Sequence, residues 1–208
     1  MAVIHHTVVT PTKLELLTAW LPTRPWYLGA GEPELAKAGG FRLDDPQGEV
    51  GIEFMVVTDV SGDPTAYLVP LTYRGAPLDG AEHALVGTME HGVLGRRWAY
   101  DGCHDPVLVA QLLALIEGRV EAQAQSTSDT PDREVTRAYT GNGLTGFTTV
   151  ADDQDGTELA GPHGATIRVH RILREAASLP AEATGHVTGV WSLQDGARVS
   201  GPFAVVRA

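Results

Sequence analysis

Apolar residues alternate with polar ones, or run together, over most of the first half of the chain, as they do in β-strands. This pattern predicts strands over residues 2–9, 41–44, 49–60, 66–73, 83–89 and 95–100. The turns at 61–64 and 90–92 join neighbouring runs into antiparallel hairpins. Because Pro70 has no backbone N–H, we expect it at a sheet edge or at a bulge.

Two segments instead repeat apolar residues every three or four positions, which predicts amphipathic helices. The first covers residues 14–21 and ends at Pro22. The second has Asp105 as its N-cap and Pro106 as its first residue, and its apolar face continues to residue 120. The second helix therefore has an apolar face that must pack against a core.

After these helices the pattern is typical of strands again. Strands are predicted over residues 134–139, 146–150, 165–172, 186–193 and 199–206. We interpret residues 152–164 as an acidic, glycine-rich loop, and Asp195-Gly196 as the turn of the last hairpin. The polar stretch at residues 126–132, which precedes these strands, predicts a flexible connection. The predicted organisation is a domain over 1–125, a connection over 126–133 and a β-rich segment over 134–208. The fold class is α+β, a mainly antiparallel sheet with two amphipathic helices.

Charge and composition exclude several classes of partner. The 26 acidic and 15 basic residues give a net charge of −11, which repels a nucleic-acid backbone and an anionic lipid surface. Cys103 is the only cysteine, so no internal disulfide can form, and we interpret it as a small packed hydrophobe. No signal peptide and no membrane span is predicted, so we expect a cytoplasmic protein.

The sequence lacks the common catalytic and metal-binding motifs. Its eight histidines form no His-Glu-x-x-His pair, and Cys103-His104-Asp105 has no second ligand cluster nearby in the sequence. The run at 152–158 resembles the start of a calcium loop but lacks the closing glutamate. Nucleophile elbows and phosphate-binding loops of the Walker type do not occur. We therefore predict no catalytic residue, metal or cofactor from motifs alone.

Aromatic residues beside turns are the candidates for ligand binding. Trp26 and Tyr27 follow Arg24 in a segment that proline and glycine keep from being helical, and Trp98 lies in a predicted strand. Aromatic side chains of this kind stack on sugar faces, and they also close the ends of a hydrophobic core. The sequence leaves both interpretations open for Arg24, Trp26, Tyr27 and Trp98.

An ordered set of segments resembles a known family. The set consists of the segments 21–29, 83–87 and 99–102, with Asp105-Pro106 opening an apolar helix. It resembles the N-terminal cap domain of actinobacterial maltokinases and related glucosamine kinases, over roughly residues 14–125. This sequence has Pro25 before Trp26, with Arg24 shifted by one place, where the family has an Arg-Trp-Tyr core.

In that family the cap precedes a kinase fold, and the segment after the cap is similar to the start of a kinase N-lobe. Residues 141–148 resemble its phosphate-covering loop, and Arg168 stands where the resemblance implies a phosphate-binding lysine. Arginine does not reproduce the compact charge of lysine, so Arg168 is a weak candidate for cofactor binding. Only 37 residues follow Arg171 (208 minus 171), which predicts that the segments for phosphoryl transfer are absent.

Three hypotheses for the function follow. The first is a non-catalytic cap-like protein of glucan, maltose or amino-sugar metabolism that binds a partner protein, such as a kinase or glucan-metabolising enzyme, or a small sugar. The second is an enzyme, either a sugar-kinase component completed by a catalytic lobe in trans or an activity of its own at His83, Asp101 and His104. The third is a carbohydrate-binding module that uses Trp26, Tyr27 and Trp98.

Overall fold

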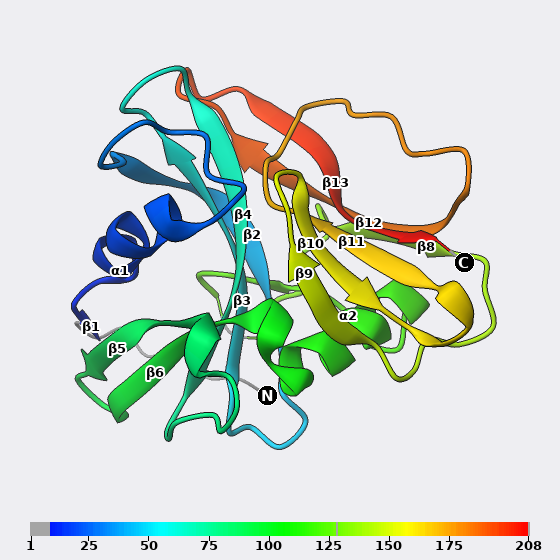
Figure 1. Ribbon diagram of the computed structural model, residues 1–208, viewed down its shortest axis with the longest axis horizontal. Helices are drawn as coiled ribbons and strands as arrows, with labels where there is room; N and C mark the ends of the chain where they lie inside the picture. The colour runs from blue at the N-terminus through cyan, green and yellow to red at the C-terminus, as the bar shows by residue number, and fades with distance from the viewer. Residues whose placement is uncertain (1–8, 128, 208) are drawn as a thin grey trace.

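A computed structural model describes residues 9–127 and 129–207 of the chain (Figure 1). Its α-helices are α1 (Lys13–Trp20) and α2 (Pro106–Glu117). The strands of the first half are β1 (Val9–Thr10), β2 (Leu35–Leu43), β3 (Gly51–Asp59), β4 (Thr65–Arg74), β5 (Leu85–His91), β6 (Gly95–Asp101) and β7 (Gln123–Ala124). Those of the second half are β8 (Thr136–Tyr139), β9 (Thr148–Asp152), β10 (Gly156–Ala160), β11 (Thr166–His170), β12 (Ala183–Ser192) and β13 (Arg198–Arg207).

The described strands form one antiparallel sheet. Its order is β1-β5-β6-β4-β3-β2-β12-β13-β11-β10-β9, with β7 beside β2 and β8 beside β12. The strands of the two chain halves meet between β2 and β12, where Gly39 pairs with Trp191. The predicted fold class, a mainly antiparallel sheet with two helices, is confirmed. The predicted domain boundary at 126–133 stays a prediction, and across it the sheet is continuous.

The sheet also curls back on itself. The backbone N–H of Leu68 donates to the carbonyl of Arg171 at 2.9 Å, and that of Leu173 donates to Ala66 at 2.8 Å. These bonds join the end of β11 to β4, so β4, β3, β2, β12, β13 and β11 close into a ring. Pro70, which was expected at an edge or bulge, lies inside β4 opposite Phe54 of β3. Along the edge of β4 that faces away from β3, residues 66 and 68 bond to residues 171–173, and pairing with β6 begins at Leu71. Pro70 lies between these two sets of bonds, so its missing N–H is tolerated there.

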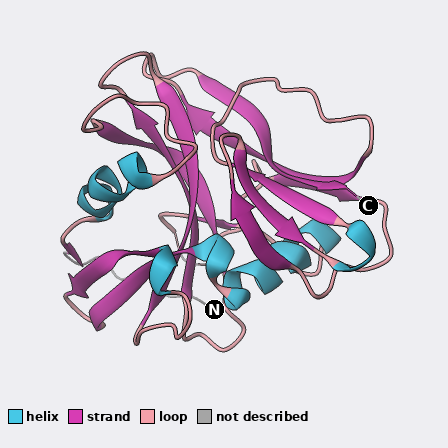
Figure 2. Ribbon diagram, in the orientation of Figure 1, coloured by secondary structure: helices cyan, strands magenta, loops and turns pink. Residues whose placement is uncertain are grey.

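Strand β3 is buried on both faces, which explains its nearly continuous run of apolar residues. On one face Phe54 stacks on Phe41 with ring centroids 4.5 Å apart, in the core that α2 shares with the strands of the second half. On the other face Met55 and Val57 pack in a second core with Trp20 of α1. Figure 2 shows α1 at the left of the sheet and α2 at its lower right.

Local signals place both helices. The side chain of Asp105 accepts the Val107 N–H at 2.9 Å, Pro106 is the first residue of α2, and Gly118 ends the helix with a φ of 75°. The helix is shorter than its apolar pattern predicted, because the chain turns at Gly118 toward β7. Helix α1 begins at the N-cap Thr12 and continues into a 3-10 turn, Leu21–Thr23, that contains Pro22.

One predicted loop is wrong in its extent. Residues 152–164 were expected to be a loop, but Gly156–Ala160 forms β10, which pairs with β9 and β11. In β10, Thr157 and Leu159 are buried and Glu158 between them is partly exposed, so the strand alternation was hidden by the acidic run. Of the predicted strand at 2–9, only residue 9 lies within the described part of the chain. Neither described α-helix is long and apolar enough to cross a bilayer.

Candidate functional site

The end of β6 carries a buried ion pair. A terminal nitrogen of Arg171 lies 2.6 Å from each carboxylate oxygen of Asp101, and both side chains have almost no exposed surface. The Arg171 Nε also donates to the Thr157 hydroxyl at 2.7 Å, and its guanidinium lies 5.2 Å from the Trp26 ring centre. Asp101 raises the pKa of Arg171 although burial acts against the charged form, so this side chain is a fixed cation.

Asp101 is also one of three potential metal ligands that lie close together. Asp101 ends β6, His104 lies in the 3-10 turn Gly102–His104 that follows, and Asp152 ends β9. One ligand atom from each of the three residues lies within 4.8 Å of the others. The Asp101 carboxylate shapes the turn because it accepts the N–H of Cys103 at 3.1 Å. The Thr157 hydroxyl, which Arg171 also contacts, donates to Asp152 at 2.5 Å.

A second histidine contacts the first. The Nε2 of His83, in the 3-10 turn Glu82–Ala84, lies 3.1 Å from the Nδ1 of His104, and the rings are perpendicular with centres 4.8 Å apart. Both histidines line a pocket of about 400 Å³, whose other lining residues include members of α2 and residues 146–148. The pocket thus joins two of the three residues named for an activity of the protein's own, and Asp101 lies behind them without exposed surface.

Burial changes the protonation of two side chains in this pocket. It lowers the pKa of His104, against the attraction of Asp101 and Asp152, so the neutral imidazole is favoured. Burial also raises the pKa of Cys103 to about 12, so its thiol stays protonated at neutral pH. The predicted role of Cys103 as a packed hydrophobe agrees with its place in the core.

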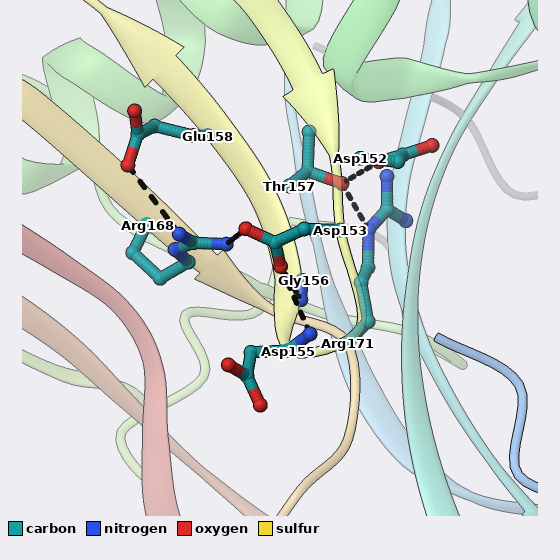
Figure 3. A network of polar contacts seen from close by, with 8 residues as sticks. All are labelled: Asp152, Asp153, Asp155, Gly156, Thr157, Glu158, Arg168 and Arg171. Carbon is teal, nitrogen blue, oxygen red and sulfur yellow. Dashed lines mark hydrogen bonds and ion pairs between the residues drawn. The ribbon is translucent and has the colours of Figure 1, made fainter. Parts of the chain in front are cut away.

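Arg168 lies on the opposite side of the β9–β10 hairpin from Arg171 (Figure 3). Its guanidinium makes ion pairs with Asp153 at 2.6 Å and with Glu158 at 3.4 Å. It lines a pocket of about 340 Å³ together with Asp155 and other residues, and does not reach the cluster around His104. The carboxylates of Asp153 and Glu158 therefore already compensate the positive charge of Arg168, the charge that the resemblance implied would bind a phosphate.

The four residues that the sequence suggested for ligand binding do not form one site. Trp26 is completely buried between Trp20 and Tyr67, with ring centres 5.8 and 5.9 Å away, so its ring offers no face to a ligand. Arg24 lies over the Trp20 ring at 4.8 Å. Trp98 packs in a separate small cluster beside Tyr100.

Tyr27 lines a groove of about 640 Å³ between α1 and residues 27–32. Its hydroxyl donates to Asp59 at 2.8 Å, and burial together with Asp59 raises its pKa to about 12. The groove also carries the carboxylates of Glu15 and Glu32, and no basic residue is among the described residues that line it. A ligand role for Arg24, Tyr27 and Trp98 stays a prediction.

Sequence reasoning missed Asp152, Thr157 and Arg171. Asp152 is separated from His104 by 48 positions (152 minus 104), and only the pairing of β10 with β9 and β11 brings it beside the end of β6. The one local signal is the spacing of Asp101 and His104, three apart around a tight turn, which places both side chains at one strand end.

The fold and these sites define an α+β domain built on one curled antiparallel sheet. Residues 20–105 match the family model of the maltokinase N-terminal cap domain, which is less than half of the 208 residues. This match lies within residues 14–125, over which the sequence resembles that family. No curated protein matches the chain.

Proposed function

We propose that this protein is a non-catalytic cap-like protein of maltose, glucan or amino-sugar metabolism in the cytoplasm, which acts by binding a partner protein or a small ligand. The link to this metabolism rests on the family of residues 20–105. The proposal that the protein is non-catalytic rests on the ion pairs of Arg168. Its guanidinium is held by Asp153 and Glu158, so it supplies no free charge to a nucleotide phosphate.

The groove at Tyr27 favours a small polar ligand. It combines one aromatic side chain with the carboxylates of Glu15 and Glu32, and these groups suit the hydroxyl and amino groups of a sugar. Hydrogen bonds from Thr12 lower the pKa of Glu15, so this carboxylate is ionised at neutral pH. A neutral or cationic sugar such as glucosamine therefore fits the groove better than a sugar phosphate does.

An activity measurement tests the non-catalytic part. The full chain is incubated with ATP, Mg²⁺ and a panel that includes maltose and glucosamine, and phosphorylated sugar is measured. We expect no product. Sugar-dependent turnover that is abolished in Arg168→Ala, but kept in the surface control Arg198→Ala, would sink the proposal and favour a kinase component.

Ligand binding is tested by calorimetric titration with glucosamine, maltose and maltooligosaccharides. A Cβ at Gly29 would lie 2.0 Å from the Tyr27 hydroxyl, whereas a Cβ at Gly62, which does not line the groove, meets nothing within 4 Å. Gly29→Ala is therefore expected to displace the Tyr27 ring and weaken binding at least tenfold, and Gly62→Ala is its matched control. A flat response to every sugar at millimolar concentration, or equal effects of the two variants, contradicts a sugar site in this groove.

A further inference from the structure

We propose that Asp101, His104 and Asp152 bind a divalent transition-metal ion, with Zn²⁺ as the ion to test. Their ligand atoms lie within 4.8 Å of one another. Ligands at about 2.0–2.2 Å from one Zn²⁺ lie about 3–4 Å apart, so small side-chain rotations complete the site. The three residues come from the end of β6, the turn after it and the end of β9, which the sheet holds together.

The charge balance favours a cation. The carboxylates of Asp101 and Asp152 carry two negative charges and Arg171 returns one positive charge, so the cluster keeps a net negative charge within a chain of net charge −11. Arg171 donates to both oxygens of Asp101 and the Cys103 N–H donates to Oδ1, which leaves one of about four lone-pair sites, on Oδ2. Asp101 can therefore bind the guanidinium and an ion at once, as a bridging carboxylate.

His83 is placed to orient His104. Metal-bound histidines usually donate the second ring N–H to a neighbouring acceptor, which fixes the ring and its tautomer. The His83 Nε2 lies 3.1 Å from the His104 Nδ1. When the Nδ1–H of His104 donates to His83, the Nε2 of His104 keeps a free lone pair for the metal. His83 is thus a positioning residue in this site.

The pocket gives the ion access and the donor set narrows its identity. Of the three proposed ligands, only His104 lines the pocket of about 400 Å³, together with His83, and Asp101 has no exposed surface, so an ion would enter the cluster past the His104 ring. Three protein ligands with an open position are typical of zinc sites that bind water or a small molecule. An imidazole nitrogen beside carboxylates suits Zn²⁺ or Co²⁺ better than Mg²⁺ or Ca²⁺.

This inference goes beyond the proposed function and does not depend on it, because the pocket shares no lining residue with the groove at Tyr27. The test uses the full chain after removal of metal with EDTA and exhaustive dialysis. All proteins carry His5→Gln and His6→Gln, so that this adjacent pair does not bind the probe. Titration with ZnCl₂ is followed by calorimetry, and titration with CoCl₂ by visible absorption.

We expect one Zn²⁺ per chain, and a Co²⁺ absorption band whose intensity reports a low coordination number. His104→Ala and Asp152→Asn are expected to weaken binding at least tenfold, and His83→Gln about tenfold. The control is His163→Asn, an exposed histidine at a φ of 60° that asparagine tolerates. Circular dichroism establishes that each variant is folded.

Several outcomes would overturn the proposal. One is binding of less than one ion per chain in the parent protein. Another is unchanged affinity in folded His104→Ala and Asp152→Asn proteins, or an equal loss in His163→Asn. Sugar binding at Tyr27 is measured separately, so its failure does not affect the result for the metal.

Discussion

Arg171 and Asp101 are 70 positions apart in the sequence, and one nitrogen of the guanidinium lies 2.6 Å from both carboxylate oxygens in the interior of the protein. The contact joins the end of β6 to the residue that follows β11. This side-chain contact therefore lies at the same place as the backbone hydrogen bonds of residues 171–173 that close the ring of strands.

Removing the cation should be strongly destabilising. Arg171→Met leaves Asp101 as an unpaired buried charge, and we expect it to lower the free energy of unfolding by about 3–5 kcal/mol. Urea denaturation followed by tryptophan fluorescence measures this change. Arg198→Met is the control, because Arg198 pairs with Glu134 at the surface and such pairs contribute about 0–1 kcal/mol.

The double variant Arg171→Met with Asp101→Leu distinguishes the contribution of the ion pair to stability from the cost of leaving one buried charge unpaired. With both charges gone no buried charge is left unpaired, so we expect it to recover most of the stability lost in Arg171→Met. Equal costs for Arg171→Met and Arg198→Met would show that the buried pair has no special weight.

A second prediction concerns the start of α2. The Asp105 carboxylate accepts the Val107 N–H at 2.9 Å and pairs with Arg74 through two contacts of 2.7 Å. Asp105→Asn keeps an oxygen for the cap but loses the ion pair, whereas Asp105→Ala loses both. We expect the alanine variant to be less stable than the asparagine variant by about 1 kcal/mol. Identical unfolding curves for the two variants would show that the Asp105 cap does not contribute to stability.

A third prediction concerns Cys103. Its side chain is 1% exposed and burial raises its pKa to about 12, so neither the thiolate nor access to it is present in the folded state. Labelling with a chromogenic disulfide reagent at pH 8 is expected to be negligible in buffer and complete in denaturant. Labelling in buffer at the rate of a free small thiol would contradict the burial of Cys103. Arg171→Met should label faster than the parent, since a larger fraction of the protein is open.

Elements set by neighbouring residues could be predicted from the sequence. Asp105-Pro106 places the start of α2, and Asp195-Gly196 places the last hairpin, where the Gly196 φ is 84°. Both depend on backbone preferences of two or three residues. Strand β10 was missed because its outward residue, Glu158, belongs to an acidic run that is typical of a loop.

The site could be predicted only in part, because its residues meet through the sheet and not through the chain. Trp26 was expected as an exposed or a core residue, and the rings of Trp20 and Tyr67 around it decide for the core. The residues around Arg171 in the sequence do not indicate its partner, since the pairing with Asp101 depends on the order of the strands in the sheet. No pattern within a window of ten residues contains that information.

The last prediction is a dependence of stability on pH that is due to Glu53. This buried carboxylate in β3 accepts hydrogen bonds from Tyr73 at 2.8 Å and Gln125 at 3.0 Å, and it pairs with Lys13. Burial alone would raise the pKa of Glu53, but the attraction of Lys13 and these hydrogen bonds outweigh it and lower the pKa below 4.5. The ionised form is therefore bound more tightly in the folded state than in the unfolded state.

The sign of the effect follows from proton linkage. Below pH 4.5, the value for the unfolded chain, the unfolded state takes up a proton more readily than the folded state. The stability due to Glu53 is thus fully present above this pH and is lost as the pH falls through the lower folded value. Urea denaturation of the parent and of Glu53→Gln at pH 7, 5, 4 and 3 tests this. We expect the variant to be less stable at pH 7 and the difference to shrink toward pH 3, whereas parallel profiles would show that Glu53 does not titrate differently on folding.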